Sequence, residues 1–280
     1  MTTSTAHGAQ AAPSPVSATR RSPVLAVLRY AAYDLRRNLR MVESLFFVIV
    51  LPSALYLMFG ALTEFGDFPA GSGNVAGTIA VSMAVYGATV ATVATTSIAG
   101  TAAVERSKGW GRLLGLTPMR QAEYAAAKVL VALAIAALPV IVVFIVAALT
   151  GADIGPIATW ISTGLITVAA SAMFALYGLT FGLLFRSESA VGAASGLLVV
   201  LAFFGNLFMP LSGTLLEIAK FTPMYGLKGL ASWPQMEGMT TGMNAAQEDS
   251  LLGLLVNVLA WTAIFAVTTL LAARRSTARA

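Results

Sequence analysis

Six long apolar segments whose interiors carry no charged residue constrain the fold of this chain more than any other feature. They cover residues 44–62, 77–103, 125–149, 156–184, 190–209 and 251–272. A helix needs about 20 residues to cross a bilayer core, and one charged residue at its centre costs about 2.5–3.5 kcal/mol to insert. Only 10% of the 280 residues are charged, against roughly 25% in soluble domains. Because runs this long exclude barrel strands, the sequence predicts an all-α membrane protein with six transmembrane helices.

The basic residues predict how these helices are oriented. All 17 Lys and Arg residues except Lys220 and Lys228 fall on the side that holds both termini, and the acidic residues show the reverse bias. By the positive-inside rule this basic side is cytoplasmic. We therefore expect a multi-pass protein of the cell membrane with both termini in the cytoplasm.

The region before the first apolar segment divides in two. Residues 1–20 are rich in Ala, Ser, Thr and Pro and are typical of a disordered cytoplasmic tail. Residues 21–41 predict an amphipathic interfacial helix, with arginines beside an apolar stripe. The stripe consists of Leu25, Leu28, Ala32, Leu35 and Leu39. A juxtamembrane segment that only stops and orients insertion is the alternative, and one segment can serve both purposes. Residues 42–280 then form the six-helix transmembrane domain.

A second non-spanning stretch, residues 210–250, lies on the external side between the fifth and sixth predicted helices. Thr214 and Glu217 have the spacing of a capping box, which predicts the start of a short helix, and Pro223 interrupts that helix. The stretch is too short to cross the membrane and too apolar to be fully exposed. A short re-entrant or interfacial helical segment and an ordinary amphipathic loop over the bundle explain it about equally well.

Several classes of chemistry lack the residues they need. The chain has no cysteine, and its single histidine, His7, lies in the polar tail. Cysteine or histidine nucleophiles and metal sites are therefore not expected, and no G-x-x-x-x-G-K-[ST] loop is present to hold ATP. The polar residues in the interiors of the apolar segments are neutral, and Asn206 and Asn257 are interpreted as interhelical hydrogen-bonding groups. Gly192 and Gly196 form a small-xxx-small pattern that favours close helix packing.

The connection between the second and third apolar segments carries the most specific pattern. It is short and charged, and it contains two leucines before a Thr-Pro break that ends one helical piece. A short helix of this kind can dock in a groove of a soluble partner, although a charged turn that only satisfies topology would look similar. The residues of interest are Glu105, Arg106, Gly109, Arg112, Leu113, Leu114, Thr117, Pro118 and Lys128.

This connection resembles that of the type-2 ATP-binding-cassette (ABC-2) exporter permeases. The family carries a Glu-Arg pair, a Gly three residues after that Arg, leucines, Thr-Pro and a later Lys. The residues above other than Arg112 occupy matching offsets. The chain departs from the family pattern at Trp110, Gly111 and Arg112. Further resemblance lies in Ser187-Glu188 before the fifth segment and in Pro223-Met-Tyr225 on the external side.

The resemblance implies a permease subunit of a drug or lipid exporter. It implies that residues 105–120 couple the bundle to a separate cytoplasmic ATPase subunit, which binds ATP and Mg while this chain binds no cofactor and is not an enzyme. It also implies that the chain pairs with a second permease copy, most simply as a homodimer. Membrane lipids are further expected partners, and nucleic acid is not expected as a partner. The cargo would be hydrophobic or amphipathic, so that efflux could confer antibiotic resistance. Candidate residues for a substrate path are Phe203, Phe204, Asn206 and Met209.

Two other classes remain open at the level of sequence. An ion-coupled secondary carrier is disfavoured because no ionisable residue lies in the middle of an apolar segment. A non-transporting membrane scaffold or sensor has no distinguishing sequence feature. Loss of transport on dissipating an ion gradient at constant ATP would indicate the carrier, and absence of nucleotide-dependent flux with every partner present would indicate the scaffold.

Overall fold

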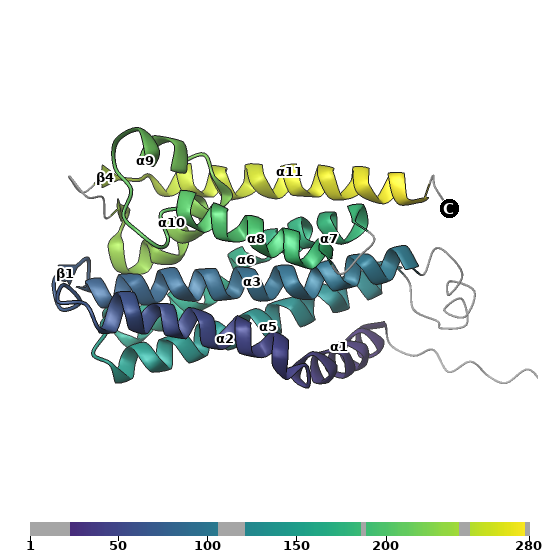
Figure 1. The fold of residues 1–280 in the computed structure, drawn as a ribbon, viewed down its shortest axis with the longest axis horizontal. Helices are drawn as coiled ribbons and strands as arrows, with labels where there is room; N and C mark the ends of the chain where they lie inside the picture. Colours follow the sequence, from purple (N-terminus) through teal and green to yellow (C-terminus); the bar gives the residue numbers. More distant parts are fainter. Residues whose placement is uncertain (1–22, 106–120, 186–188, 241–246, 278–280) are drawn as a thin grey trace, which may run out of the picture.

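The computed structural model describes residues 23–105, 121–185, 189–240 and 247–277. Most of its long helices pack lengthwise beside one another, as Figure 1 shows. In chain order the helices are α1 (Pro23–Leu39), α2 (Val42–Tyr56) with the π-helical continuation η1 (Leu57–Ala61), α3 (Val75–Glu105), α5 (Gln121–Leu149), α6 (Ile157–Ser171), α7 (Met173–Leu184), α8 (Ser189–Phe204), α9 (Gly213–Ala219), α10 (Pro223–Met236) and α11 (Leu251–Thr277). Two antiparallel hairpins pair β1 (Pro69–Ala70) with β2 (Gly73–Asn74) and β3 (Met239–Thr240) with β4 (Gln247–Glu248).

Four helical stretches within the described ranges are long and apolar enough to cross a membrane. They are Val75–Gly100, Ala126–Leu149, Ile157–Leu184 and Leu251–Arg275. The first and fifth predicted segments coincide with shorter apolar helices, Leu45–Ala61 and Gly192–Phe204. The prediction of an all-α membrane protein is therefore confirmed, whereas the number of six crossings stays a prediction.

The apolar side chains are distributed unequally between the centre and the outside of the bundle. The apolar window of α3 is 83% buried, whereas that of α11 is only 11% buried despite a mean hydropathy of 2.1. Leu252 and Leu259 of α11 are 72% and 66% exposed. Soluble proteins rarely leave so large an apolar face in water. The outer face of α11 therefore requires lipid or another protein against it.

Glycine residues allow α3 and α7 to approach closely. A Cβ atom added at Gly178 would overlap the hydroxyl group of Thr96 and would lie 2.8 Å from the carbonyl oxygen of Val93. One added at Gly100 would lie 2.9 Å from the Cα atom of Gly182. Small residues at a crossing let two backbones come near enough to gain dispersion contacts, which drive helix association in lipid. This crossing holds α7 against the central helix.

We expect Gly178→Ala to lower the free energy of unfolding by about 1–3 kcal/mol, because the added methyl group meets backbone atoms that cannot rotate away. The matched control is Gly164→Ala, since a Cβ atom there would lie 3.6 Å from the nearest ring carbon of Phe144, an ordinary contact. Thermal unfolding of both purified variants in detergent measures the difference. Equal midpoints would show that the α3–α7 crossing has room to adjust.

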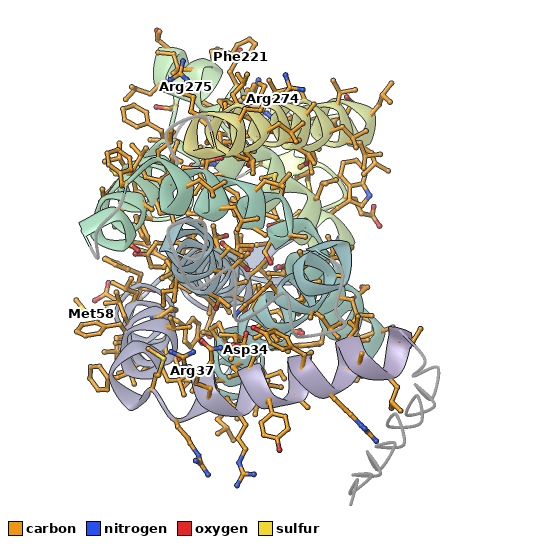
Figure 2. All side chains as sticks on the ribbon, turned by 90° about the vertical axis from the view of Figure 1, so that its right-hand side faces the viewer. Asp34, Arg37, Met58, Phe221, Arg274 and Arg275 are labelled. Atoms are coloured by element: carbon orange, nitrogen blue, oxygen red, sulfur yellow. The ribbon has the colours of Figure 1, made fainter. Side chains whose placement is uncertain are left out.

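The amphipathic helix predicted for residues 21–41 is present as α1, but the leucine stripe is not the face that packs on the bundle. Leu25 and Leu28 are 46% and 50% exposed, whereas Ala31 and Asp34 are buried. In Figure 2 α1 runs across the lower edge of the molecule, while α2 and α3 are seen more nearly end-on. The exposed leucines remain available for a membrane surface, so the interfacial location stays a prediction.

The two ends of the bundle differ in charge. The exposed arginines of α1 lie at the same end as Arg274 and Arg275 of α11, and Figure 2 shows Arg37 of α1 on this end face with them. The hairpins and helices α9 and α10, which carry Lys220 and Lys228, lie at the other end (Figure 1). This separation agrees with the charge bias of the sequence, and the assignment of the arginine-rich end to the cytoplasm stays a prediction.

Residues 210–250 contain two helices, but the predicted capping box is wrong. Helix α9 follows Ser212 as its N-cap, and no side-chain hydrogen bond caps it. The carboxylate of Glu217 instead accepts a hydrogen bond from Lys220 at 3.0 Å, so it is not used at the start of the helix. Pro223, predicted to interrupt the first helix, is the first residue of α10, the position where a missing N–H costs nothing.

Candidate functional site

A polar cavity lies at the hairpin end of the bundle, between α10, β3 and the beginning of α11. It has room for a water-sized group, about 20 Å³. Its lining comes from parts of the chain that are far apart in sequence, namely Thr78, Asn206, Tyr225, Lys228, Gly229, Ser232, Met236, Gly238, Met239, Thr240, Asp249 and Leu254. Buried polar groups in a membrane protein are costly and are therefore often functional. This cavity is the candidate functional site.

A buried lysine is the central feature of the cavity. Helix α10 begins where the hydroxyl oxygen of Thr222 accepts a hydrogen bond from the backbone N–H of Tyr225, at 3.3 Å. One turn later Lys228 is only 8% exposed, and its Nζ donates a hydrogen bond to the carbonyl oxygen of Asn206 at 2.8 Å. Burial lowers the pKa of Lys228 to about 8, and the carboxylate of Asp249 partly opposes this shift. The ammonium group is therefore still mostly protonated at neutral pH.

The carboxylate of Asp249 is held by neutral donors. Its Oδ2 accepts hydrogen bonds from the hydroxyl groups of Tyr225 and Thr240, each at 2.6 Å. Burial raises the pKa of Tyr225, and the hydrogen bond and charge of Asp249 raise it further, so the phenol stays a donor. In the part of the chain that the structure describes, no ion pair joins Asp249 to Lys228. The buried cation thus faces a carboxylate that other groups already bind.

Two buried donors of the lining have no hydrogen-bond partner among the described residues. Asn206 has left-handed backbone geometry, with φ of 60°, and its Oδ1 accepts a hydrogen bond from the backbone N–H of Leu211 at 2.7 Å. Its Nδ2 is unpaired, and so is the hydroxyl group of Ser232. The two residues are 2% and 7% exposed. Each unpaired buried group costs about 1–3 kcal/mol, so this arrangement needs an explanation other than stability.

The wall of the cavity is fixed by Gln235. Its Nε2 donates hydrogen bonds to the carbonyl oxygen of Ala70 at 3.2 Å and to the hydroxyl oxygen of Thr78 at 3.1 Å. The backbone carbonyl oxygen of Gln235 also accepts a hydrogen bond from the backbone N–H of Ser72 at 2.9 Å. Helix α10 is thereby tied to the first hairpin and to α3, which holds the lining residues in place.

The four residues proposed for a substrate path do not share one surface. Asn206 lies in the cavity, whereas Phe203, Phe204 and Met209 are 48%, 42% and 48% exposed and do not line it. Asn206 lies beyond the end of α8, and its carbonyl group, not its side chain, is what binds Lys228. By contrast, the side chain of Asn257 donates to the carbonyl oxygens of Lys220 and Thr222, as an interhelical hydrogen-bonding group would.

An ion pair lies at the opposite, arginine-rich end. The Nζ atom of Lys128 on α5 lies 2.7 Å from Oδ2 of Asp34 on α1, and the two side chains are 16% and 8% exposed. The Lys128 ammonium group also lies 5.7 Å from the ring centre of Tyr30. Figure 2 shows Asp34 on the side of α1 that faces the bundle, whereas Arg37, one turn from it, is exposed. This pair fixes α1 to α5 close to the connection that the sequence analysis singled out.

Most of the predicted coupling residues lie outside the described residues. Glu105 is the last residue of α3, and α5 begins at Gln121. The residues between them that were named as coupling residues are Arg106, Gly109, Arg112, Leu113, Leu114, Thr117 and Pro118. Their role stays a prediction.

The sequence analysis missed the cavity residues Lys228, Tyr225, Asp249 and Ser232. One signal was available: Lys228 is the sole charge within the apolar run 225–233 of the external stretch. A lysine at this position is either buried together with the neighbouring apolar residues or interrupts the apolar run. Among the described residues, no cluster of three His, Cys, Asp or Glu side chains has the arrangement of a metal site.

Comparison with known proteins gives one partial similarity. Over 141 residues the chain is 30% identical to a protein of Bacillus subtilis (strain 168) described as "Putative transport permease YvfS". The match covers 48% of this chain and 56% of that protein, so the chain spans about half the length of the curated relative that it matches. No family model matches the chain. The similarity supports a place among membrane transport permeases.

Proposed function

We propose that this chain is the transmembrane permease subunit of an ATP-binding-cassette exporter, powered by a separate ATPase subunit that binds ATP and Mg. The observation that carries the proposal is the similarity over 141 residues to a transport permease, in a chain whose described part is a bundle of apolar helices. In this proposal the chain moves a hydrophobic or amphipathic substrate, drug-like or lipid-like, across the cell membrane.

The ion pair at the arginine-rich end supports a coupling role for this end of the bundle. Lys128 lies seven residues after the first residue of α5, so the Asp34 contact anchors α1 beside the site where residues 105–120 leave and re-enter the bundle. A force applied by an ATPase to this connection would reach α1 and α5 together. Alternating access then requires only that the ATPase contacts differ between two states of the bundle.

The exposed glycines of α8 support pairing with a second copy of the chain. Gly192 and Gly196 are exposed, and a Cβ atom added at either would meet no atom within 4 Å. Within the described part of the chain the small-xxx-small face is therefore not used, although such faces are typical of close helix–helix contact in membranes. A homodimer that uses this face is the simplest arrangement.

The dimer proposal predicts that Gly192→Leu combined with Gly196→Leu weakens self-association by at least about tenfold, since the larger side chains keep the backbones apart. The measurement is the monomer–dimer equilibrium of the purified protein in detergent, followed by light scattering. The matched control is Leu197→Met, a conservative change at an exposed position of the same helix that lies about 100° around the helix from Gly196. Unchanged association in the glycine variant would rule out this face.

The experiment that tests the proposed function starts from the native membrane. The tagged full-length chain is purified in mild detergent, and co-purifying proteins are searched for a chain with a Walker-type phosphate loop. We expect such a chain, and we expect ATP-dependent movement of a fluorescent hydrophobic drug when both are reconstituted together in liposomes. Drug movement by the permease alone, driven by an ion gradient, would favour an ion-coupled carrier and refute the proposal.

A further inference from the structure

In the part of the chain that the structure describes, the buried cation of the hairpin-end cavity forms no ion pair. The ammonium group of Lys228 makes one described hydrogen bond, to a neutral carbonyl oxygen. A buried charge is expensive unless it is paired, and the charge of Asp249 only partly offsets the effect of burial on Lys228. Among the described residues, two of its three N–H groups have no acceptor.

The neighbouring groups also lack an acceptor. Asn206 and Ser232 line the same cavity and are more than nine-tenths buried. Nδ2 of Asn206 and Oγ of Ser232 have no partner among the described residues. The NH2 group of an asparagine can only donate, and a hydroxyl group can donate. Together with Lys228 they offer three kinds of donor to one small space. An acceptor rich in lone pairs would satisfy all of them at once.

Asp249, the acidic residue of the lining, does not provide the missing acceptor. Asp249 uses its Oδ2 to accept from Tyr225 and Thr240 at 2.6 Å each. These neutral donors share its charge, and among the described residues no ion pair joins it to Lys228. The field around the ammonium group therefore remains suited to a second anionic group.

The size of the cavity limits what can enter. Space of about 20 Å³ accepts one oxygen-sized group and not a whole ligand. The lining also includes the apolar side chains of Met239, which is 43% exposed, and Leu254. A ligand that fits places one anionic oxygen inside and keeps the remainder outside, beside apolar surface.

We infer that this cavity binds an oxyanion of the phosphate class through Lys228, Asn206 and Ser232. The phosphate group belongs either to a lipid headgroup or to free inorganic phosphate, which share this chemistry. The site lies at the end of the bundle opposite the predicted ATPase connection. It is therefore separate from any phosphate of ATP, and binding to it needs neither transport nor nucleotide.

The test is direct binding to the full-length protein in a neutral detergent, measured by calorimetry with two probes: dihexanoyl phosphatidic acid and inorganic phosphate. We expect wild type to bind at least one probe saturably. Lys228→Gln, which keeps an N–H donor but removes the charge, is expected to weaken binding by at least about 30-fold, and Ser232→Ala by about 5–10-fold. If only the lipid probe binds, the ligand is a lipid headgroup. If both probes bind, the phosphate group by itself is sufficient for binding.

The matched control is Lys220→Gln, which removes the same charge from the same external stretch but outside the cavity. It is expected to bind as wild type does. Folding of each variant is checked by circular dichroism and gel filtration, and Ser232→Ala, which only shortens a small side chain, tests the site if Lys228→Gln does not fold. No binding of either probe by wild type, or equal loss in the Lys220 and Lys228 variants, would overturn the inference.

Discussion

Leu113→Asp and Glu105→Lys are each expected to reduce drug-stimulated ATPase activity of the reconstituted complex to its unstimulated level. The resemblance to type-2 exporter permeases implies that both residues belong to the connection proposed to contact the ATPase subunit. An aspartate at position 113 would have to be desolvated in an apolar groove of the partner, at a cost of several kcal/mol. The measurement is ATP hydrolysis in proteoliposomes with and without a hydrophobic drug.

The control for these variants is Arg275→Glu. Arg275 is exposed at the same end of the bundle (Figure 2) and lies outside the proposed coupling element. This charge reversal is expected to leave the stimulation unchanged, and all three variants are expected to insert into the membrane normally. Full stimulation in both Leu113→Asp and Glu105→Lys would contradict the coupling role.

The helical part of the fold could be predicted from the sequence because a bilayer imposes a simple rule. Runs of about 20 apolar residues must hydrogen-bond internally and therefore form helices. All six predicted segments are helical over most of their length, including 156–184, which the structure divides into α6 and α7 at Ala172. Whether the shorter helices Leu45–Ala61 and Gly192–Phe204 cross a membrane depends on their tilt and on the bilayer, which length and composition do not determine.

The orientation of α1 could not be predicted from hydrophobicity alone. The stripe of Leu25 and Leu28 predicted the face that avoids water, and this face is exposed on the isolated chain. The face that packs on α5 contains an aspartate because Lys128 lies opposite it. Pairing of two charges 94 positions apart leaves no periodic signal, so the sequence pattern indicated the exposed face and missed the packed face.

The cavity residues were missed for a similar reason. Lys228, Asn206, Ser232 and Asp249 come together only because the hairpins and Gln235 fix α10 against α3. None of them lies in a recognisable motif, and the sequence interpretation assigned Asn206 to a helix–helix hydrogen bond. The positive φ of Asn206 ends α8 earlier than its hydropathy indicates and turns the carbonyl group towards Lys228.

The ion pair of Asp34 and Lys128 provides the second large expected effect. Both side chains are mostly buried, and their nitrogen and oxygen atoms are 2.7 Å apart. Removing one charge of a buried pair costs about 3–5 kcal/mol. We therefore expect Asp34→Asn to lower the thermal unfolding midpoint in detergent by roughly 5–10 °C. Arg37→Gln, which removes an exposed charge of the same helix, is expected to shift it by less than about 2 °C.

A double-mutant cycle separates the pair from the individual residues. If the contact itself stabilises the packing of α1 on α5, Asp34→Asn combined with Lys128→Met should cost less than the sum of the two single variants, because no unpaired charge remains. The reversed pair, Asp34→Lys with Lys128→Asp, should recover part of the loss, since attraction is restored while the packing around Tyr30 is not. Additive single effects would show that the two residues act independently. In that case the force path proposed from the ATPase connection through α5 to α1 would lose its physical basis.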